Sequence, residues 1–350
     1  MENGKRKMKD ETQTLHRESN RRDEPDLDSL PKAKMEFVEP MLAKLVKQVP
    51  DGKAWQYEVK LDGYRALAIK SGGHITMFSR RGNVLNGRFP KIARSFGFLP
   101  DNTIIDGEVI ALDDDGKPSF AALQKRERGQ PLYFYVFDVL AYKGKDVRKV
   151  PLSERRNLLE NYVLDEARDP IRLSTVFSAN AQELIKAARA QGLEGIVAKR
   201  TDSIYESGER SGAWLKYKTD KSQELVIGGY KPGSNTFDYL LAGYYEGKKL
   251  MFVGKIKNGF TPVLRRKVAE QFRGLETDVC PFANLPEQKN ARRGEALTAE
   301  VMAKCKWLKP KLVAHIEFTE WTEDNHLRHS RFAGLRDDKD PRDVTHDVAA

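Results

Sequence analysis

The sequence predicts an α+β protein in which a mixed α/β body is followed by a small β-barrel. In the body, strand-like segments alternate with capped helices up to about residue 218. After residues 219–223 the pattern changes to short strands separated by Gly-rich turns. Residues 1–34 differ from both parts, because they carry nine basic and eight acidic residues but few large apolar ones. Such a segment cannot bury enough surface to offset its ordering entropy, so we expect a disordered charged arm over residues 1–34.

The body begins with a strand in which Trp55, Tyr57, Val59 and Leu61 alternate with polar residues, as is typical of a half-buried strand. Further strands are predicted over residues 67–69, 75–78, 103–112, 132–140, 195–199 and 214–218. The apolar composition of residues 132–140 is typical of a central strand, so the body is expected to contain a sheet.

Two helices are predicted in the body from their termini. One begins at Pro151 with Ser153 as its N-cap. The other follows Asn180, which forms a capping box with Glu183, and stops at Gly192.

The second part is predicted to contain strands over residues 224–230, 239–246, 250–256 and 312–320, with a helix over residues 262–272. Several strands with one helix and a late strand are typical of a small β-barrel such as an OB-fold.

Composition excludes several classes of protein. The chain has 61 Lys and Arg against 51 Asp and Glu, a net charge of +10 that favours a polyanionic partner. The sequence contains no run of 18 or more apolar residues, so no transmembrane helix is predicted. Residues 1–10 lack the apolar region of a secretory signal. Cys280 and Cys305 form neither a disulfide framework nor a Cys-x-x-Cys zinc motif, so a reducing cytosol is the expected compartment.

Residues 58–65 carry the strongest chemical signal. Lys60 ends a strand and is followed by Asp62, Gly63 and Arg65. A lysine amine is nucleophilic only when neutral, and burial or neighbouring cations lower its pKa. Gly63 permits a tight turn beside a bound group, and Arg65 can bind a phosphate or a ribose. An isolated match of this kind is more often a surface hairpin with solvated charges.

Other fragments accompany it. Glu108 ends the segment of residues 106–108, which follows a strand. Glu194 is the first residue of the segment 194–199. The two carboxylates could hold a hard divalent cation across one cleft. Lys216 and Lys218 point to the same face of their strand, where they repel each other unless an anion lies between them.

Together these segments resemble the ATP-dependent DNA ligases, within the covalent nucleotidyltransferase superfamily that also includes RNA ligases and mRNA capping enzymes. They are most similar to the ligase domain of bacterial non-homologous end-joining ligases, over about residues 35–345. The six collinear motifs of the superfamily correspond to residues 60–65, 106–108, 135–138, 194–199, 214–218 and 336–339. Ser79-Arg80-Arg81-Gly82 corresponds to an additional element of the ligases. Asp337 stands where the end-joining group usually has proline.

The resemblance implies a nucleotidyltransferase domain of the ATP-grasp-like DNA ligase kind over residues 35–221 and an OB-fold domain over residues 222–345. It implies ATP as the nucleotide and Mg²⁺, or Mn²⁺ in its place, as the metal. It also implies three phosphoryl transfers: AMP moves from ATP to Lys60, then to the 5′-phosphate of a break, and is displaced by the 3′-hydroxyl.

The resemblance also assigns roles to the site residues. Lys216 and Lys218 contact the α-phosphate, Glu194 holds the metal, and Asp62 lies near the 3′-hydroxyl of the break. Glu108 either assists Glu194 at the metal or binds the ribose. The remaining nucleotide-binding residues are Glu58 and Lys199, Arg65 and Arg80 at the ribose or nick phosphate, Phe137 on the adenine, and Arg336 and Lys339 at the β- and γ-phosphates. For Phe137, a place in the apolar core is an equally good interpretation, because its strand is apolar throughout.

The expected substrate is double-stranded DNA with nicks or ends. Basic clusters in the second part, such as Lys304, Lys306, Lys309 and Lys311, would give sequence-independent affinity for its backbone. A Ku-type end-binding partner, a monomer without membrane contact, and the bacterial cytosol or nucleoid are further expectations. Two alternatives stay open: an RNA ligase or guanylyltransferase on the same scaffold, and a nucleic-acid-binding protein without activity.

Overall fold

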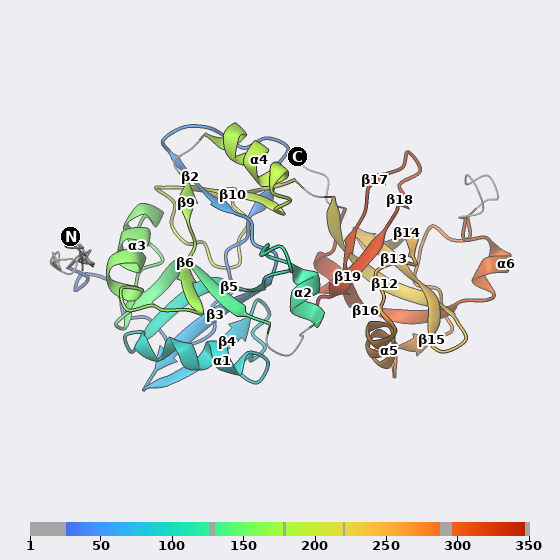
Figure 1. Ribbon diagram of the computed structural model, residues 1–350, viewed down its shortest axis with the longest axis horizontal. Coiled ribbons are helices and arrows are strands. Elements are labelled where there is room, and N and C mark those ends of the chain that lie inside the picture. Colours follow the sequence, from blue (N-terminus) through green and yellow to red (C-terminus); the bar gives the residue numbers. More distant parts are fainter. Residues whose placement is uncertain (1–25, 126–129, 178–179, 220, 288–295, 347–350) are drawn as a thin grey trace, which may run out of the picture.

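The protein was analysed as a computed structural model, which describes residues 26–125, 130–177, 180–219, 221–287 and 296–346. The chain forms two lobes (Figure 1). Among the described residues, the first lobe contains two sheets and four α-helices, and the second lobe begins with strand β12 (Ser222–Pro232). This mixed content confirms the expected α+β class. No described helix has the length and apolar character needed to cross a lipid bilayer.

The first sheet of the first lobe is largely antiparallel and lies at its centre. Its strand order is β4 (His74–Ser79), β3 (Tyr64–Ser71), β5 (Thr103–Ala111), β6 (Leu132–Tyr142) and β7 (Lys145–Asp146), with β8 (Ile171–Leu173) parallel to β6. Strand β3 is buried on both faces, because Ala66 and Ala68 join one apolar cluster while Leu67 and Ile69 join another.

The second sheet carries four residues of the expected site, Glu58, Lys199, Lys216 and Lys218. Its order is β1 (Lys44–Leu45), β11 (Trp214–Lys218), β10 (Gly195–Arg200), β2 (Trp55–Val59) and β9 (Val176–Phe177). Tyr57, Ile196 and Ala198 point to one face, where they pack in a cluster with residues of helix α4 (Ala181–Ala190). Alternate residues of the same strands therefore point to the other face.

The helices of the first lobe agree only partly with expectation. Asn180 caps α4 by accepting a hydrogen bond from the Glu183 backbone N–H at 2.9 Å, as predicted. Helix α3 (Leu152–Leu158) has Pro151 at its N-cap position, so the prediction of Ser153 as the cap was wrong. A π-helical turn over Leu159–Val163 continues it. Two further helices were not predicted from the sequence. They are α1 (Pro90–Ser95), which is followed by a 3₁₀ turn over Phe96–Phe98, and α2 (Phe120–Lys125).

Part of the segment that was expected to be a disordered arm is ordered. Its first 25 residues lie outside the described residues, but residues 26–34 contact the first lobe. The Ala33 N–H donates to Gly144 O, and the Asp146 N–H donates to Pro31 O, each at 2.8 Å. Leu27 and Leu30 pack against the core. These two leucines supply apolar contacts with the lobe. The many charged residues of the segment 1–34 had led to the expectation that no such contacts form.

The second lobe is a curled sheet that closes on itself. Its order is β14 (Lys249–Ile256), β13 (Phe237–Glu246), β12, β16 (Lys306–Glu317) and β15 (Glu276–Thr277), and β19 (Arg331–Leu335) also pairs with β16. The barrel closes where Asn258, just after β14, bridges Arg331. The remaining elements are α5 (Pro262–Glu270), α6 (Ala299–Met302), the hairpin β17 (Glu320–Trp321) and β18 (Leu327–Arg328), and a 3₁₀ turn over Pro341–Asp343.

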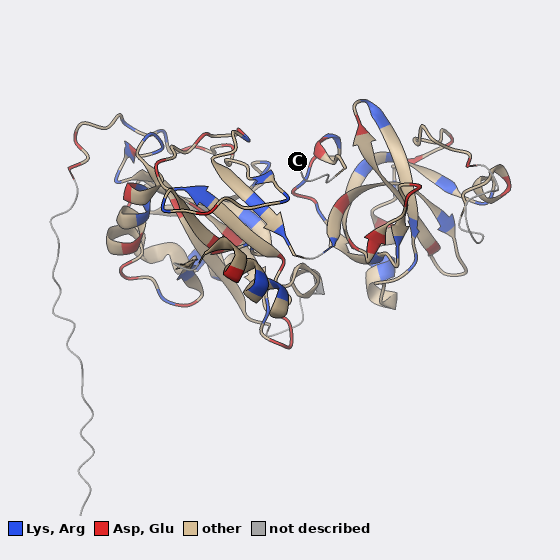
Figure 2. Ribbon diagram, turned by 90° about the horizontal axis from the view of Figure 1, so that it is seen from above, with Lys and Arg blue, Asp and Glu red and all other residues tan. Residues whose placement is uncertain are grey.

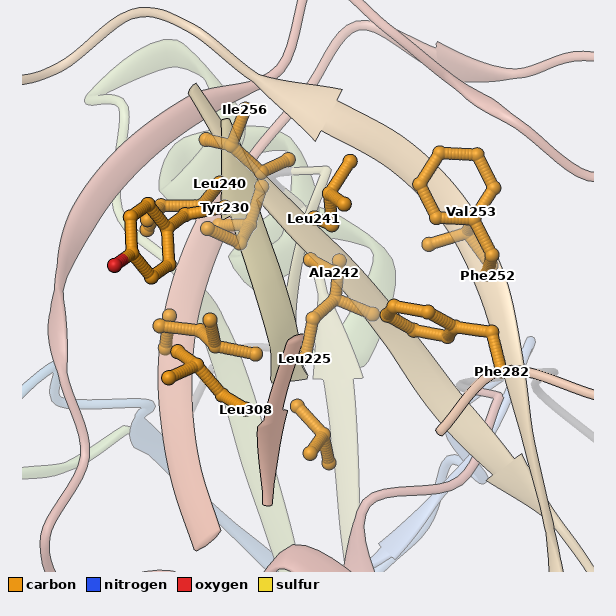
Figure 3. Close-up of a cluster of buried hydrophobic side chains, with 14 of the residues drawn as sticks. Leu225, Tyr230, Leu240, Leu241, Ala242, Phe252, Val253, Ile256, Phe282 and Leu308 are labelled. Atoms are coloured by element: carbon orange, nitrogen blue, oxygen red, sulfur yellow. The ribbon is translucent and has the colours of Figure 1, made fainter. Parts of the chain in front are cut away.

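The barrel encloses its own apolar core, which is separate from the clusters of the first lobe. Figure 3 shows Leu225, Leu240, Phe252 and Phe282 among the side chains that fill it. Helix α5 is capped by Thr261, whose hydroxyl accepts from the Leu264 N–H at 3.2 Å.

The two lobes meet at helix α2, which lies beside β19 (Figure 1). Gly334 of β19 makes this contact possible, since a Cβ there would lie 2.5 Å from Gln124 Cγ and 2.8 Å from Phe120 Cε1. Gln124 Nε2 donates to Leu335 O at 3.1 Å and to the Tyr64 hydroxyl at 2.7 Å. The lobes are therefore in a closed arrangement.

Candidate active site

A cavity of about 180 Å³ lies between the lobes. It is lined by every residue of the predicted site, namely Glu58, Lys60, Asp62, Arg65, Arg80, Glu108, Phe137, Glu194, Lys199, Lys216, Lys218, Arg336 and Lys339. The structure thus brings together residues that are up to 281 positions apart in the sequence, from Glu58 to Lys339.

Strand register explains why so many of these side chains share one face. Val197 of β10 lies opposite Lys216 of β11 and opposite Glu58 of β2. Because side chains alternate along a strand, Lys199 and Lys218 follow on the same face. Lys60 comes directly after β2, and its backbone N–H donates to Gly195 O at 2.9 Å. The sheet therefore directs Lys199, Lys216 and Lys218 into the cavity.

Two glycines next to these residues are required by close packing. A Cβ on Gly63 would lie 2.2 Å from Val109 O. A Cβ on Gly107 would lie 2.2 Å from Phe134 Cε1 and 2.5 Å from Tyr135 O. Both glycines let the backbone of one strand approach its neighbour, so their part in the motifs is to bring the site strands together.

Lys60 is paired with Glu194 in this closed arrangement. The Lys60 ammonium forms an ion pair with Glu194 Oε1, and both side chains are largely buried. Burial opposes the charge on Lys60, but the Glu194 carboxylate outweighs it and raises the pKa of Lys60 above its ordinary value. The expectation of a lowered pKa was therefore wrong for this state. Lys218 acts in the expected direction, because its charge lowers the pKa of Lys60.

Glu194 has properties that suit a cation ligand. Burial opposes its ionisation, but Lys60 and then Lys218 hold its pKa below the ordinary value, so it is a carboxylate. Its second oxygen, Oε2, is buried and receives no hydrogen bond from the described residues. Within those residues there is no group of three or more His, Cys, Asp or Glu side chains that could hold a metal. One carboxylate is nevertheless compatible with Mg²⁺, which often binds through one or two carboxylates together with substrate phosphates.

Glu108 differs from Glu194 in its protonation. Burial raises the pKa of Glu108 to about 8, although Arg336, Lys60 and Arg65 act against the rise. The carboxyl is therefore mainly neutral at pH 7 and can donate a hydrogen bond.

Arg65 is already bound by protein groups. Its Nε and Nη2 donate to the two oxygens of Asp106 at 3.0 and 2.5 Å, and its Nη1 donates to Met41 O at 2.5 Å. Tyr205 also donates its hydroxyl proton to Asp106, at 2.6 Å. Arg65 lines the cavity, but a fork onto a phosphate would require this network to change.

Glu58 and Lys199 form a buried pair at one end of the cavity. Lys199 Nζ lies 2.7 Å from Glu58 Oε1, and Ser174 donates its hydroxyl proton to Glu58 Oε2 at 2.8 Å. Lys199 Nζ also lies 4.5 Å from the ring centroid of Phe137 and 4.4 Å from that of Trp214. Phe137 both lines the cavity and packs against a core cluster, so its place in the core is observed and adenine stacking stays a prediction.

The aspartate next to Phe137 is structural. Asp138 accepts two hydrogen bonds at 2.8 Å from Arg155, and both side chains are fully buried. Arg155 also donates to Val150 O at 2.6 Å and to Ser203 O at 3.0 Å. The pair fastens helix α3 to the central strand β6.

Replacing Asp138 by alanine is expected to destabilise the protein by about 3–5 kcal/mol, because Arg155 would keep its charge in the core without a partner. Chemical denaturation of the variant and the wild type measures this difference. The matched control is Asp202→Ala, which removes the partner of Arg200 from an exposed ion pair. Equal unfolding midpoints for Asp138→Ala and Asp202→Ala would contradict the prediction.

The second lobe contributes its own pairs to the cavity. Arg336 donates to both oxygens of Asp338 at 2.8 Å, and both residues are buried. Lys339 Nζ lies 3.5 Å from Glu224 Oε1. Arg80 of the first lobe lies 3.7 Å from Asp343. The last motif is therefore folded into the cavity rather than extended into solvent.

Asp337 has a partner across the lobe junction. It forms an ion pair with Arg88, whose Nη2 donates to the Tyr64 hydroxyl at 2.6 Å. Asp337, which replaces the usual proline at this position, thus forms a contact between the lobes.

Sequence reasoning missed His315 and Glu224, which line the cavity, and it assigned no role to Trp214 and Asp338, which lie within the motifs and line the cavity as well. A signal existed for His315, which interrupts the apolar run Val313, Ala314, Ile316. Glu224 lies on the first strand after the lobe connection, and no sequence pattern distinguishes it from a solvated residue.

Comparisons with known proteins agree with this geometry. A family profile described as "ATP dependent DNA ligase domain" matches residues 40–218, and one described as "ATP dependent DNA ligase C terminal region" matches residues 233–339. The chain is 34% identical over 320 residues to the multifunctional non-homologous end joining protein LigD of Pseudomonas aeruginosa, covering 89% of this chain and 36% of that protein. It is 33% identical over 297 residues to the LigD protein of Mycolicibacterium smegmatis, covering 83% and 37%.

Among solved structures, a mycobacterial DNA ligase D complexed with ATP and MES matches with a TM-score of 0.65 at 30% identity, covering 88% of this chain and 98% of that one. The match extends through both lobes, so the first is a nucleotidyltransferase fold and the second an OB-fold. The chain spans only 36–37% of the length of the curated relatives named above.

Proposed function

This chain belongs to the ATP-dependent DNA ligase family, and we propose that it seals breaks bearing a 5′-phosphate and a 3′-hydroxyl by way of a lysyl-AMP on Lys60. The observation that carries the proposal is the convergence of all the residues that the chemistry needs on one cavity. A protein that only binds nucleic acid would not need this set of buried and paired side chains. Residues 35–221 would form the adenylation domain and residues 222–345 the OB-fold domain.

In the first step the Lys60 amine attacks the α-phosphate of ATP. A P–N bond forms, the bond from the α-phosphorus to the bridging oxygen breaks, and pyrophosphate leaves. The amine must first lose its proton, and burial and Lys218 favour the neutral amine once the Glu194 charge is compensated. Lys216 and Lys218 then neutralise the charge that develops on the α-phosphate.

Glu194 would hold the metal through its unpartnered Oε2. Mg²⁺, or Mn²⁺ in its place, would there neutralise phosphate charge and orient the phosphates. Glu108 would either assist Glu194 at the metal or bind the ribose. Burial raises the pKa of Glu108, which suits a hydrogen bond to a ribose hydroxyl, whereas a bound cation would lower this pKa and favour the carboxylate.

Arg336 and Lys339 would bind the β- and γ-phosphates and orient pyrophosphate for departure. Their entry into the cavity depends on the closed arrangement of the lobes. DNA would then enter after the OB-fold domain swings away, and Asp62 would act at the 3′-hydroxyl.

The proposed substrate is double-stranded DNA, and the proposed process is end joining, as in the names of the LigD relatives. Lys and Arg occur on both lobes together with Asp and Glu (Figure 2). Lys304, Lys306, Lys309 and Lys311 are exposed on the second lobe, where they could contact phosphates. A Ku-type end-binding protein is the partner that this process would require.

The proposal is tested by incubating the protein with α-labelled ATP or GTP and a divalent cation, followed by denaturing electrophoresis. We expect a label from ATP that pyrophosphate removes, and transfer of AMP to a nicked DNA duplex. Labelling by GTP alone would make the chain a guanylyltransferase. Sealing of nicked RNA but not DNA would make it an RNA ligase, and no labelling of AMP-free protein would overturn the enzymatic proposal.

A further inference from the structure

Tyr64 of β3 lies four residues after Lys60, and the chemistry proposed above does not use its side chain. The residue is 1% exposed, and its ring packs against the rings of Phe89 and Phe120 in the first lobe. Its hydroxyl lies at the junction with the OB-fold domain, where it is 3.4 Å from Leu335 O. Tyr64 therefore belongs to the core of one lobe and reaches the backbone of the other.

Two side chains of the first lobe donate hydrogen bonds to the Tyr64 hydroxyl. Arg88 Nη2 donates to it at 2.6 Å and Gln124 Nε2 at 2.7 Å. A hydroxyl oxygen has two lone pairs, so these two donors occupy both of them. Burial raises the pKa of Tyr64, so the hydroxyl keeps its own proton for Leu335 O. The bonds from Arg88 and Gln124 lie within one lobe, so they hold these two side chains whether or not the lobes are closed.

Arg88 and Gln124 in turn hold the segment on either side of Arg336. Gln124 Nε2 donates to Leu335 O at 3.1 Å, and Arg88 forms an ion pair with Asp337. Leu335 and Asp337 are the residues immediately before and after Arg336. An exposed ion pair contributes little by itself, and the Asp337 side chain is 64% exposed. The restraint on this segment therefore depends on the hydrogen bonds that meet at the tyrosine hydroxyl.

The guanidinium of Arg336 also lies over two aromatic rings of the first lobe. Its Cζ is 4.4 Å from the ring centroid of Phe120 and 5.5 Å from that of Tyr64. A guanidinium at this distance from an aromatic face is attracted to it. Arg336 lines the cavity, so the two rings help to set where its charge stands in the site. These contacts and those of the neighbouring residues all cross the junction, so they depend on the closed arrangement.

We propose that Tyr64 is a positioning residue of the first step. Its hydroxyl holds Arg88 and Gln124 as a clasp for residues 335–337, and this clasp sets Arg336 at the β- and γ-phosphates of ATP. The clasp releases the segment when the OB-fold domain swings away, so it takes no part in sealing a nick that is already adenylated. The inference rests on the ligase activity proposed above and on the role proposed there for Arg336.

The test compares two steps in Tyr64→Phe, which removes the hydroxyl and keeps the ring in the core. We expect lysyl-AMP formation from α-labelled ATP to slow about ten-fold, and sealing of a pre-adenylated nick to change less than about two-fold. A merely structural role would affect both steps alike. The matched control is Tyr57→Phe, at a buried tyrosine whose hydroxyl donates to Pro50 O at 2.8 Å within the same lobe. It is expected to perform both steps at the wild-type rate.

The decisive variant is Tyr64→Phe combined with Arg336→Ala. If Tyr64 acts through Arg336, the double variant forms lysyl-AMP at the rate of Arg336→Ala alone, because the group that Tyr64 positions is already absent. A further ten-fold loss in the double variant would overturn the inference and leave the proposed function intact. A wild-type rate of labelling in Tyr64→Phe, or equal losses in its two steps, would do the same. Absence of labelling in the wild type would overturn the proposed function, and this inference with it.

If Tyr64→Phe does not fold, as judged by thermal unfolding, Gln124→Met decides the question. Methionine keeps the length of the side chain but cannot donate to the Tyr64 hydroxyl or to Leu335 O. Gln124 is only partly buried, so the change leaves the core intact. We expect Gln124→Met to form lysyl-AMP about five-fold more slowly and to seal a pre-adenylated nick at the wild-type rate. Wild-type labelling, or equal losses in both steps, would contradict the clasp.

Discussion

Replacing Lys60 by alanine is expected to reduce covalent adenylation by at least about 10⁴-fold, because the change removes the proposed attacking amine. Lys218 lines the same cavity, but its Nζ donates to Ser222 O at 2.9 Å and lies on a different strand. The measurement is the formation of labelled protein from α-labelled ATP, with transfer to nicked DNA as the second readout.

Loss of Lys60 also removes the partner of Glu194, and this could weaken the fold as well as the chemistry. Lys60→Arg separates the two effects, because a guanidinium keeps the ion pair with Glu194 but is always protonated and cannot attack phosphorus. We expect Lys60→Arg to unfold close to the wild-type midpoint and to form no adduct. The matched control, Lys53→Ala, removes an exposed lysine just before β2 and should be labelled normally.

Normal labelling of Lys60→Arg would contradict the assignment of the nucleophile. A sealing activity that persists in Lys60→Ala with ATP but without a protein adduct would contradict the three-step route. Sealing of a nick that already carries a 5′-adenylate is expected to continue in Lys60→Ala, because the last step does not use the Lys60 amine as nucleophile.

The site residues could be predicted from the sequence because their positions follow from strands. Glu58, Lys60, Lys216 and Lys218 lie at alternating positions of segments whose pattern was already typical of strands, and alternation fixes the face. The resemblance to a family then supplied the relation between segments far apart in the chain. The barrel followed from the same signals, as short strands with glycine-rich turns.

The pairs inside the cavity could not be predicted in this way. Arg65 was expected to bind the ribose or the nick phosphate, but its guanidinium is hydrogen-bonded to Asp106. Lys60, the expected nucleophile, is held as a cation by its ion pair with Glu194. Both outcomes depend on distances across the folded site, which a local pattern does not contain. Short elements were missed for a related reason, since α2 has only six residues and its helical form depends on packing at the lobe junction.

Removing Arg336 is the second change with a large expected effect. Arg336→Ala is expected to slow lysyl-AMP formation about 100-fold, because its guanidinium would stabilise charge on the departing pyrophosphate. The same variant should lose less than about three-fold in sealing a pre-adenylated nick, a step in which no pyrophosphate departs. The reverse reaction, release of AMP from Lys60 by pyrophosphate, should slow in parallel with the forward one.

Asp338 makes the interpretation of Arg336→Ala ambiguous unless a further variant is included. Arg336 donates to both oxygens of this buried carboxylate, so Arg336→Ala leaves it without a partner. The double variant Arg336→Ala with Asp338→Ala removes that unpaired charge. If Arg336 binds phosphate, the double variant stays slow; if it only neutralises Asp338, the first step recovers. Arg273→Ala, at an exposed arginine after α5, is the matched control and should form lysyl-AMP at the wild-type rate.

The step-selective loss would also establish that the closed arrangement belongs to the nucleotide step. Arg336 reaches the cavity only because β19 packs against α2, where Gly334 leaves room for Phe120 and Gln124. Gly334→Leu is therefore expected to reproduce the Arg336→Ala defect without altering any charged residue, since its side chain would separate the lobes. Equal losses in adenylation and in sealing for both variants would show that closure serves every step, and the assignment of Arg336 to the ATP phosphates would then fail.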